Sequence, residues 1–209
     1  MASNQVTKLN LINQSNDQDN SEVLIFQRNA ASDSDELAIA WTVIQNLGQG
    51  DNHPFDFPLE LTVNATDAWG NYTPQFSAYP GDAYSMELKA SGDQLVFYPP
   101  GAALPTDIEV RNDLQVGAID AYVYRDGKLL ATWTGVAPGR KAVFTSNATI
   151  FIGVASQVQE GDVMNAAIIS SINTELSLVG IASADILMTG GGAGPDDPFQ
   201  FQLQNVRFF

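Results

Sequence analysis

Apolar and polar residues alternate along the N-terminal part of the chain, in short stretches separated by polar segments. In residues 6–12, Leu9 and Leu11 fall on one side of an extended chain, with polar neighbours between them. Successive side chains of a strand point to opposite faces, so this alternation predicts a strand with one buried face. A polar segment, residues 13–21, leads to a second apolar run at residues 22–28, which we predict to be the next strand.

Further short apolar runs follow, each bounded by glycine, proline, asparagine or aspartate. This spacing of runs and turn residues is typical of an antiparallel all-β protein. Prolines fall between the runs, where they remove no hydrogen bond from a central strand. We predict the remaining strands at residues 59–63, 83–88, 94–98, 108–111, 141–144, 149–155 and 199–209.

The clearest local pattern is a β-hairpin over residues 119–134. Two apolar runs flank the sequence Arg125-Asp126-Gly127-Lys128. Asp-Gly supplies the positive φ angles of a type I′ turn, and the twist of this turn matches that of the strands it joins. We therefore predict a two-residue turn at Asp126 and Gly127.

Two segments fit more than one kind of element. Residues 36–47 fit a strand, because apolar residues alternate, and also a helix with Ser34 as its N-cap. Their Ile, Thr and Val content favours a strand buried on both faces. Residues 162–175 favour a helix that is capped by Asp162 and packs across the end of a sandwich. Its apolar stripe comprises Met164, Ala167, Ile168 and Ile172.

Together these elements predict an all-β, antiparallel β-sandwich with at most one or two short helices. A chain of 209 residues fits a single β-sandwich domain, residues 1–209. Residues 9–13 and 108–112 each end a run in Asn and lead through a loop to a return strand. One interpretation is two pseudo-repeated halves, residues 1–105 and 106–209. The other is that any two β-hairpins look this similar.

The composition narrows the class of protein. Apolar residues make up 44% of the chain and charged residues 16%, which is the balance of a folded chain. The net charge of -15 repels a phosphate backbone, so we expect no nucleic-acid binding. The chain contains no cysteine, which excludes disulfides, thiolate nucleophiles and cysteine-ligated metals.

The N-terminal segment is polar and lacks the basic region and apolar core of a signal peptide. No stretch of the chain is apolar over the roughly 18 residues that a membrane helix needs. We therefore expect a cytoplasmic protein without a transmembrane segment.

Residue types that carry catalysis are scarce. His53 is the chain's one histidine, and a Ser-His-Asp triad would have to use it, with Asp51 or Asp56 nearby in the sequence. The simpler interpretation of His53 is a turn residue before Pro54. With one histidine and no cysteine, a zinc or copper site would consist mostly of carboxylates, which suit those metals poorly. We therefore expect that the protein is not an enzyme.

Carboxylates are the abundant functional group. Asp17, Asp19 and Glu22 place oxygen ligands at intervals along one loop, as the first half of a calcium loop does, although the glycine and distant glutamate of an EF-hand are absent. Two further acidic clusters occur at residues 33–36 and 196–197. Calcium prefers such hard oxygen ligands, so Ca2+ is the one cofactor that we consider. The alternative is that the acidic loops are simply solvated.

Residues 67–74 combine aromatic and polar side chains in a turn-prone stretch. Trp69 and Tyr72 lie beside Asp67 and Asn71. An aromatic ring can pack on the apolar face of a pyranose while amide and carboxylate groups bind its hydroxyls. We therefore predict that these four residues bind carbohydrate. The alternative is that the two rings cover the end of a core.

The resulting hypothesis is a non-enzymatic, lectin-like binding protein whose acidic loops hold calcium. Two alternatives stay open. The first is a structural protein that assembles with copies of itself into a homo-oligomer, and the second is a membrane-acting toxin component. Fold class alone does not decide between them.

Overall fold

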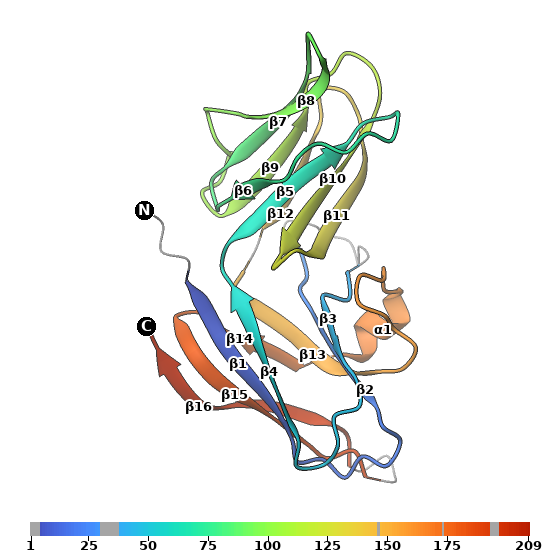
Figure 1. The fold of residues 1–209 in the computed structure, drawn as a ribbon, viewed down its shortest axis with the longest axis vertical. Helices are drawn as coiled ribbons and strands as arrows, with labels where there is room; N and C mark the ends of the chain where they lie inside the picture. Colours follow the sequence, from blue (N-terminus) through green and yellow to red (C-terminus); the bar gives the residue numbers. More distant parts are fainter. Residues whose placement is uncertain (1–4, 30–37, 146, 173, 193–196) are drawn as a thin grey trace. The chain divides into compact units, whose positions relative to one another are not determined.

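The computed structural model describes residues 5–29, 38–145, 147–172, 174–192 and 197–209. Strands dominate this part of the chain, which contains one short helix, so the predicted all-β, sandwich-like class is confirmed (Figure 1). The acidic residues 33–36, Ser34 and Asp196 lie outside the described residues.

The chain divides into two compact units. Unit 1 comprises Met1–Arg28, Glu36–Leu59 and Ala148–Phe209, and unit 2 comprises Asn29–Asp35 and Glu60–Asn147. The single domain and the halves that meet at residue 105 stay predictions.

Unit 1 consists of two four-stranded sheets. Its strands are β1 (Val6–Asn13), β2 (Glu22–Phe26), β3 (Thr42–Ile44), β4 (Asn52–Pro58), β13 (Thr149–Ala155), β14 (Thr174–Ser177), β15 (Ile181–Thr189) and β16 (Gln200–Phe208). One sheet has the strand order β16-β15-β1-β4 and the other β14-β13-β2-β3. The N-terminal and C-terminal segments therefore share both sheets, since β1 pairs with β15 and β2 with β13.

Unit 2 also consists of two four-stranded sheets. Its strands are β5 (Leu61–Thr66), β6 (Phe76–Ala78), β7 (Ala83–Lys89), β8 (Gly92–Phe97), β9 (Asp107–Asn112), β10 (Ile119–Arg125), β11 (Lys128–Val136) and β12 (Lys141–Thr145). One sheet has the order β11-β10-β5-β6 and the other β12-β9-β7-β8.

The two units share one strand plan in a cyclically shifted order. Unit 1, followed from β13 to β16 and then from β1 to β4, matches unit 2 followed from β5 to β12. β1 lies between the parallel strand β15 and the antiparallel strand β4, just as β9 lies between parallel β7 and antiparallel β12. β2 lies between antiparallel β3 and β13, as β10 does between β11 and β5. The similar segments 9–13 and 108–112 thus fall on equivalent strands, β1 and β9.

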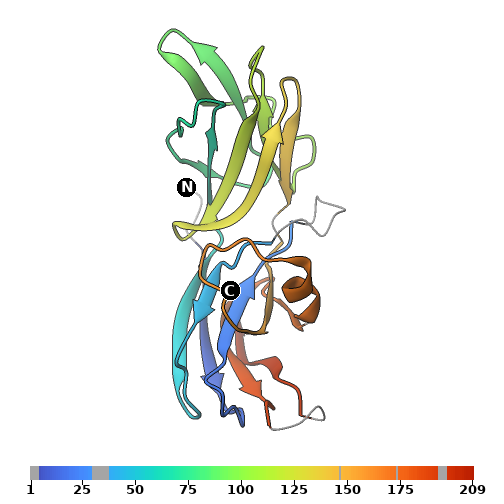
Figure 2. The ribbon, with the colours of Figure 1, turned by 90° about the vertical axis from the view of Figure 1, so that its right-hand side faces the viewer.

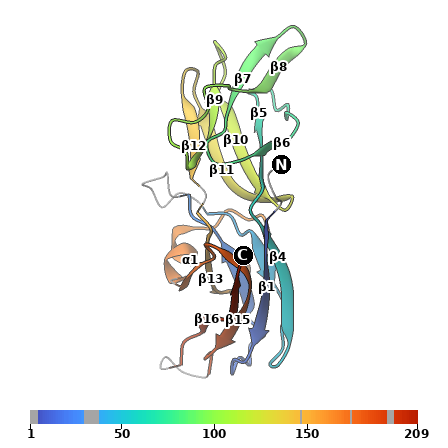
Figure 3. The ribbon, with the colours of Figure 1, turned by 90° about the vertical axis from the view of Figure 1, so that its left-hand side faces the viewer.

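Helix α1 (Ala166–Ser171) covers one face of the β14-β13-β2-β3 sheet, as Figures 2 and 3 show from two sides. Met164, Ile169 and Ile172 pack there against Leu24 and Phe26 in a buried apolar cluster. α1 therefore lies over a face of the sheet. The prediction that it packs across the end of the sandwich was wrong. Among the described residues, no helix has the length and apolar character to cross a membrane.

The helix is also shorter than the predicted segment 162–175. Asn165 is its N-cap, with Oδ1 accepting from the Ile168 N–H at 3.0 Å. Asp162 is unavailable as a cap because its carboxylate accepts from the Gln159 N–H, closing the preceding turn. Ala167 of the predicted stripe is exposed, and Ile169 is buried in its place.

The segment predicted as a long strand, residues 36–47, is described from residue 38 on; in this part it is a strand at β3 and has an isolated bridge from Ile39 to Val163. Beside that bridge, Ala38 O accepts from Met164 N (2.9 Å) and Ala40 N donates to Asp162 O (2.9 Å). The backbone here pairs with the chain that leads to α1, which interrupts the regular sheet.

The pattern missed β4 because the strand contains Pro54 and Pro58. β4 is the edge strand of its sheet, and an edge strand tolerates proline because one side of its backbone needs no partner. His53 lies inside this strand, paired with Leu11, so its interpretation as a turn residue was wrong.

The predicted hairpin is confirmed. β10 and β11 pair up to Arg125 and Lys128, and the two residues between them have positive φ angles, 54° at Asp126 and 72° at Gly127. These are the angles that a type I′ turn requires.

Candidate functional site

The predicted carbohydrate loop connects β5 to β6 in unit 2, and Asp67 organises it. Asp67 Oδ1 accepts hydrogen bonds from the backbone N–H groups of Trp69 (2.8 Å) and Asn71 (2.9 Å), and Oδ2 accepts from Asn71 Nδ2 (2.9 Å). Burial by itself raises the pKa of Asp67, but the hydrogen bonds from Asn71, Trp69 and Gly70 outweigh it and leave the pKa below 3.8. Asp67 and Asn71 thus bind each other and shape the turn.

The same turn leaves two aromatic side chains exposed. Trp69 is 85% exposed and Tyr72 is 66% exposed. Tyr72 forms an isolated bridge with Thr66 at the end of β5, so the two side chains lie on the same face of the sheet. The rings therefore do not cover the end of a core, which was the alternative interpretation.

Tyr72 meets a second aromatic residue that the loop sequence does not contain. Its ring centroid lies 5.9 Å from that of Tyr122 on β10, with the planes tilted by 33°. Tyr124 follows two residues later on the same strand and therefore lies on the same face of the sheet. Three tyrosines from a loop and a strand thus gather on one face.

Polar side chains of β5 lie next to these tyrosines on the same face of the sheet. Tyr122 pairs with Asn64 and Tyr124 with Thr62, while Thr66 pairs with Asp120. Asn64 is 5% exposed and Thr66 7%, yet Asn64 Oδ1 and Thr66 Oγ1 have no hydrogen-bond partner of good geometry. We call Trp69, Tyr72, Tyr122 and Tyr124, with Asn64, Thr66 and Asp120, the aromatic face.

The tyrosines of β10 are neutral phenols over the physiological pH range. Burial raises the pKa of Tyr122; Asp120 and Tyr72 raise it further, against an opposing hydrogen bond from Thr66. Burial also raises the pKa of Tyr124, with a smaller contribution from Tyr72. Both hydroxyls can therefore donate as well as accept a hydrogen bond.

The equivalent face of unit 1 is built differently. Leu24 on the central strand β2 pairs with Val43 and Gly153, just as Tyr122 on β10 pairs with Thr132 and Asn64. The next residues on this face are Phe26 and Phe151 in unit 1 and Tyr124 and Thr62 in unit 2. This face therefore carries only apolar side chains at these positions in unit 1, whereas in unit 2 it carries phenol, hydroxyl and amide groups.

The difference follows from what lies over each face. In unit 1 the connection from β13 to β14 carries α1, and a Cβ added to Gly153 would come within 2.8 Å of the buried Ile172 side chain. In unit 2 the equivalent connection is the short loop with Trp69 and Tyr72. The first face is covered by the protein itself, whereas the second presents aromatic rings to solvent.

The predicted calcium residues lie in unit 1. Asp17 accepts hydrogen bonds from Asp19 N (3.0 Å), Ser21 N (2.7 Å) and Ser21 Oγ (3.1 Å). Burial by itself raises the pKa of Asp17, and these hydrogen bonds outweigh it, so the pKa lies below 3.8. Glu22 Oε1 accepts from Gln45 Nε2 (2.8 Å). Among the described residues, no group of three or more His, Asp or Glu side chains is arranged to hold a metal ion.

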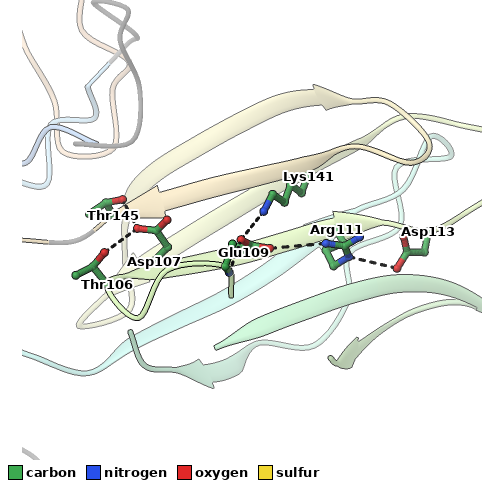
Figure 4. A network of polar contacts seen from close by, with 8 residues as sticks. Thr106, Asp107, Glu109, Arg111, Asp113, Lys141 and Thr145 are labelled. Carbon is green, nitrogen blue, oxygen red and sulfur yellow. Dashed lines mark hydrogen bonds and ion pairs between the residues drawn. The ribbon is translucent and has the colours of Figure 1, made fainter. Parts of the chain in front are cut away.

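A second polar cluster lies on the other sheet of unit 2 (Figure 4). Glu109 on β9 is 2% exposed and accepts from Lys141 Nζ (2.5 Å) and Ala103 N (2.8 Å), with Arg111 3.8 Å away. Asp107 accepts from the hydroxyls of Thr106 and Thr145. Each carboxylate is matched by donors from neighbouring segments, so this cluster ties the chain before β9 to the sheet.

The sequence indicated the loop of the aromatic face but not its strand. Tyr122 and Tyr124 were assigned only to the predicted hairpin, although their spacing of two placed both on one face. The pairing of β10 with β5, which brings these tyrosines to Tyr72, joins segments whose register the sequence does not reveal.

No family model matches the chain, and no curated protein or solved structure matches it. The aromatic face is therefore interpreted from its own geometry and chemistry.

Proposed function

We propose that the protein is a non-enzymatic binding protein that recognises carbohydrate on the aromatic face of unit 2. The observation that carries the proposal is the contact of Tyr72 with Tyr122, in a unit whose loop also exposes the ring of Trp69. Sugars have an apolar face that stacks on aromatic rings and hydroxyls that bind phenol and amide groups.

The contrast with unit 1 supports a hydroxyl-rich ligand. A face that receives an apolar helix consists of Leu, Phe and Gly, as around Leu24 and Gly153. The equivalent positions in unit 2 are Tyr122 and Asn64. A partner with an apolar surface would bury the phenol hydroxyls of Tyr122 and Tyr124 without satisfying them, at a cost of about 1–3 kcal/mol per group.

A glycan array probed with the whole protein, with and without a calcium chelator, tests this function. Trp69→Ala should abolish or strongly weaken binding, and its fold should persist because the side chain is mostly exposed. Phe208→Ala is the matched control, since it removes an exposed ring from unit 1 and should bind as the parent does. Absence of binding by folded protein in both conditions would reject the proposal.

Calcium bound by Asp17, Asp19 and Glu22 is part of the same proposal. It is supported by the hard oxygen ligands in this loop. The measurement is the melting temperature with added Ca2+ and with chelator, compared between the parent and Asp19→Asn. Equal melting temperatures in both conditions would remove calcium from the proposal.

A second candidate function, assembly with copies of the same chain, is favoured by the edge strand β16. It is nine residues long, contains no proline, and has one charged residue, Arg207, so most of its edge lacks the groups that protect against pairing. Light scattering should then report particles that grow as the pH falls toward the pI of about 4.1. Gln202→Lys on this edge should reduce the growth, and a parent protein that stays monomeric throughout would exclude assembly.

A further inference from the structure

The aromatic groups of unit 2 extend along the sheet and are not confined to one point. Tyr122 and Tyr124 are two residues apart on β10, which separates them by about 7 Å along the strand. The Tyr72 ring is 5.9 Å from the Tyr122 ring, and Tyr72 also influences the ionisation of Tyr124. Trp69, three residues before Tyr72 in the same loop, adds a fourth ring, which is 85% exposed. The series is longer than the one ring that a single sugar unit needs.

The charged side chain of the aromatic face itself is acidic, and Arg125, which follows Tyr124, is buried on the other face of the sheet. Asp120 lies on the same face, two residues before Tyr122, and Asp67 is ionised at the base of the loop. None of the residues of the aromatic face is basic, and the chain carries a net charge of -15. A uronate, sialate or sulfate group would meet repulsion here without a cation to pair with.

Two polar side chains of β5, Asn64 and Thr66, lie on the same face as the tyrosines of β10. Thr66 acts on the hydroxyl of Tyr122, and Asn64 on that of Tyr124. Asn64 and Thr66 are too buried to reach a ligand themselves. Tyr122 and Tyr124 themselves combine ring surfaces with hydroxyls two residues apart on one face of β10.

We infer that the ligand is a linear, uncharged oligosaccharide that lies along β10 and contacts Trp69, Tyr72, Tyr122 and Tyr124 in succession. This inference rests on the proposed carbohydrate-binding function. Each ring takes one sugar unit, so that affinity is a property of chain length and not of one terminal sugar. Asp120 accepts a hydroxyl hydrogen bond and excludes anionic chains.

The experiment measures tryptophan fluorescence of the whole protein during titration with neutral hexose oligomers of increasing length. Affinity should rise by roughly tenfold or more between the monosaccharide and the tetrasaccharide, then level off. Oligomers of the same length that carry uronates or sulfates should bind more weakly at low salt. Equal affinity for monosaccharide and tetrasaccharide, or a preference for the anionic chains, would overturn the linear, uncharged ligand while leaving carbohydrate binding intact.

Variants at the end of the series separate length recognition from recognition of a single sugar. Tyr124→Ala should weaken tetrasaccharide binding severalfold and weaken disaccharide binding by a smaller factor, because a disaccharide can bind to the other rings. Tyr124→Phe keeps the ring and should retain most of the tetrasaccharide affinity, which guards against a general folding defect. The inference would be overturned if each variant, Tyr124→Ala and Tyr124→Phe, lost affinity for the disaccharide and for the tetrasaccharide by the same factor. Failure of every oligosaccharide to bind would reject the proposed function itself.

Discussion

Asn13 and Asn112 occupy equivalent positions in the two units and share a pattern of side-chain and backbone hydrogen bonds. Each asparagine is the last residue of its strand. Its partner on the parallel neighbouring strand is a methionine, Met188 for Asn13 and Met86 for Asn112. Asn13 Nδ2 donates to Leu47 O (2.6 Å), and Asn112 Nδ2 donates to Val136 O (2.8 Å). Each Oδ1 accepts from the backbone N–H two residues later.

The backbone around the two asparagines is also equivalent. Gly50 N donates to Asn13 O, and Gly139 N donates to Asn112 O, both at 2.7 Å. In each unit the side chain thus joins the loop after its own strand to the turn before the neighbouring strand, β4 or β12. A buried side chain that satisfies several backbone groups at once is a strong local determinant of structure.

Asn112→Ala should therefore destabilise the protein by about 2–4 kcal/mol, because it leaves the carbonyls of Gly117 and Val136 and the N–H group of Leu114 without this partner. Urea unfolding measures the change. Gln94→Ala removes an exposed amide from the same unit and should change the free energy of unfolding by less than about 0.5 kcal/mol. Equal, small effects of the two substitutions would contradict the role of Asn112.

Gly153 is required by the contact of the α1 segment with its sheet. An added Cβ would lie 2.8 Å from Ile172 Cγ1 and 2.9 Å from Cγ2, and Ile172 is buried. Gly153→Ala should cost about 1–3 kcal/mol of unfolding free energy because the neighbouring cluster must shift.

The double variant Gly153→Ala, Ile172→Ala tests the cause of this cost. Removing the two Ile172 atoms removes the clash, so the double variant should be more stable than the sum of the two single effects predicts. Additive effects in thermal or chemical unfolding would show that the contact is not responsible.

Local patterns predicted most strands of this chain but missed β4, β6, β14 and β15. Asp126-Gly127 determines its turn within two residues, so the hairpin was predictable from the sequence. β4 was not, because its prolines are acceptable only at a sheet edge, and the position of an edge depends on the pairing of distant segments. The candidate site follows the same rule: the loop with Trp69 and Tyr72 was recognisable, whereas Tyr122 reaches it only through the pairing of β10 with β5.

Glu109 is the buried carboxylate of the cluster in Figure 4, and its replacement should be costly. Glu109→Gln removes the charge that Lys141 and Arg111 share and weakens the contact to Ala103 N, so we expect a loss of about 2 kcal/mol. The loss stays below that of a fully buried pair because the two cationic side chains are about one third exposed.

Glu87→Gln is the control for this substitution. Glu87 forms an ion pair with Lys89 at the same distance, 2.5 Å, but its side chain is 36% exposed, against 2% for Glu109. Exposed pairs contribute about 0–1 kcal/mol and are screened by salt. Unfolding at low and high salt should show a small, salt-sensitive change for Glu87→Gln and a larger, less salt-sensitive change for Glu109→Gln. The opposite ranking would mean that burial does not set the strength of these pairs.

Tyr84 should make the protein less stable at alkaline pH. Burial, followed by the charge of Asp82 and by Tyr79, raises the pKa of Tyr84 to about 12, while an unfolded tyrosine ionises near 10. The folded protein therefore keeps a proton that the unfolded chain loses between pH 10 and 12, and stability must fall as the pH rises through this window. Below pH 10 both states hold the proton, and the contribution of Tyr84 to the pH dependence vanishes.

Tyr84→Phe separates this effect from the other tyrosines. The variant loses the hydrogen bond from the Tyr84 hydroxyl to Ser77 O (2.5 Å), so it should be less stable at neutral pH by about 1 kcal/mol. Its stability should then decline less steeply than that of the parent between pH 10 and 12. Urea unfolding at several pH values gives both slopes, and parallel slopes would show that Tyr84 ionises in the folded protein as it does in the unfolded chain. Burial is the main cause of the raised pKa. A difference in stability between parent and variant that does not change with pH would therefore indicate that the Tyr84 hydroxyl is hydrated in the folded protein.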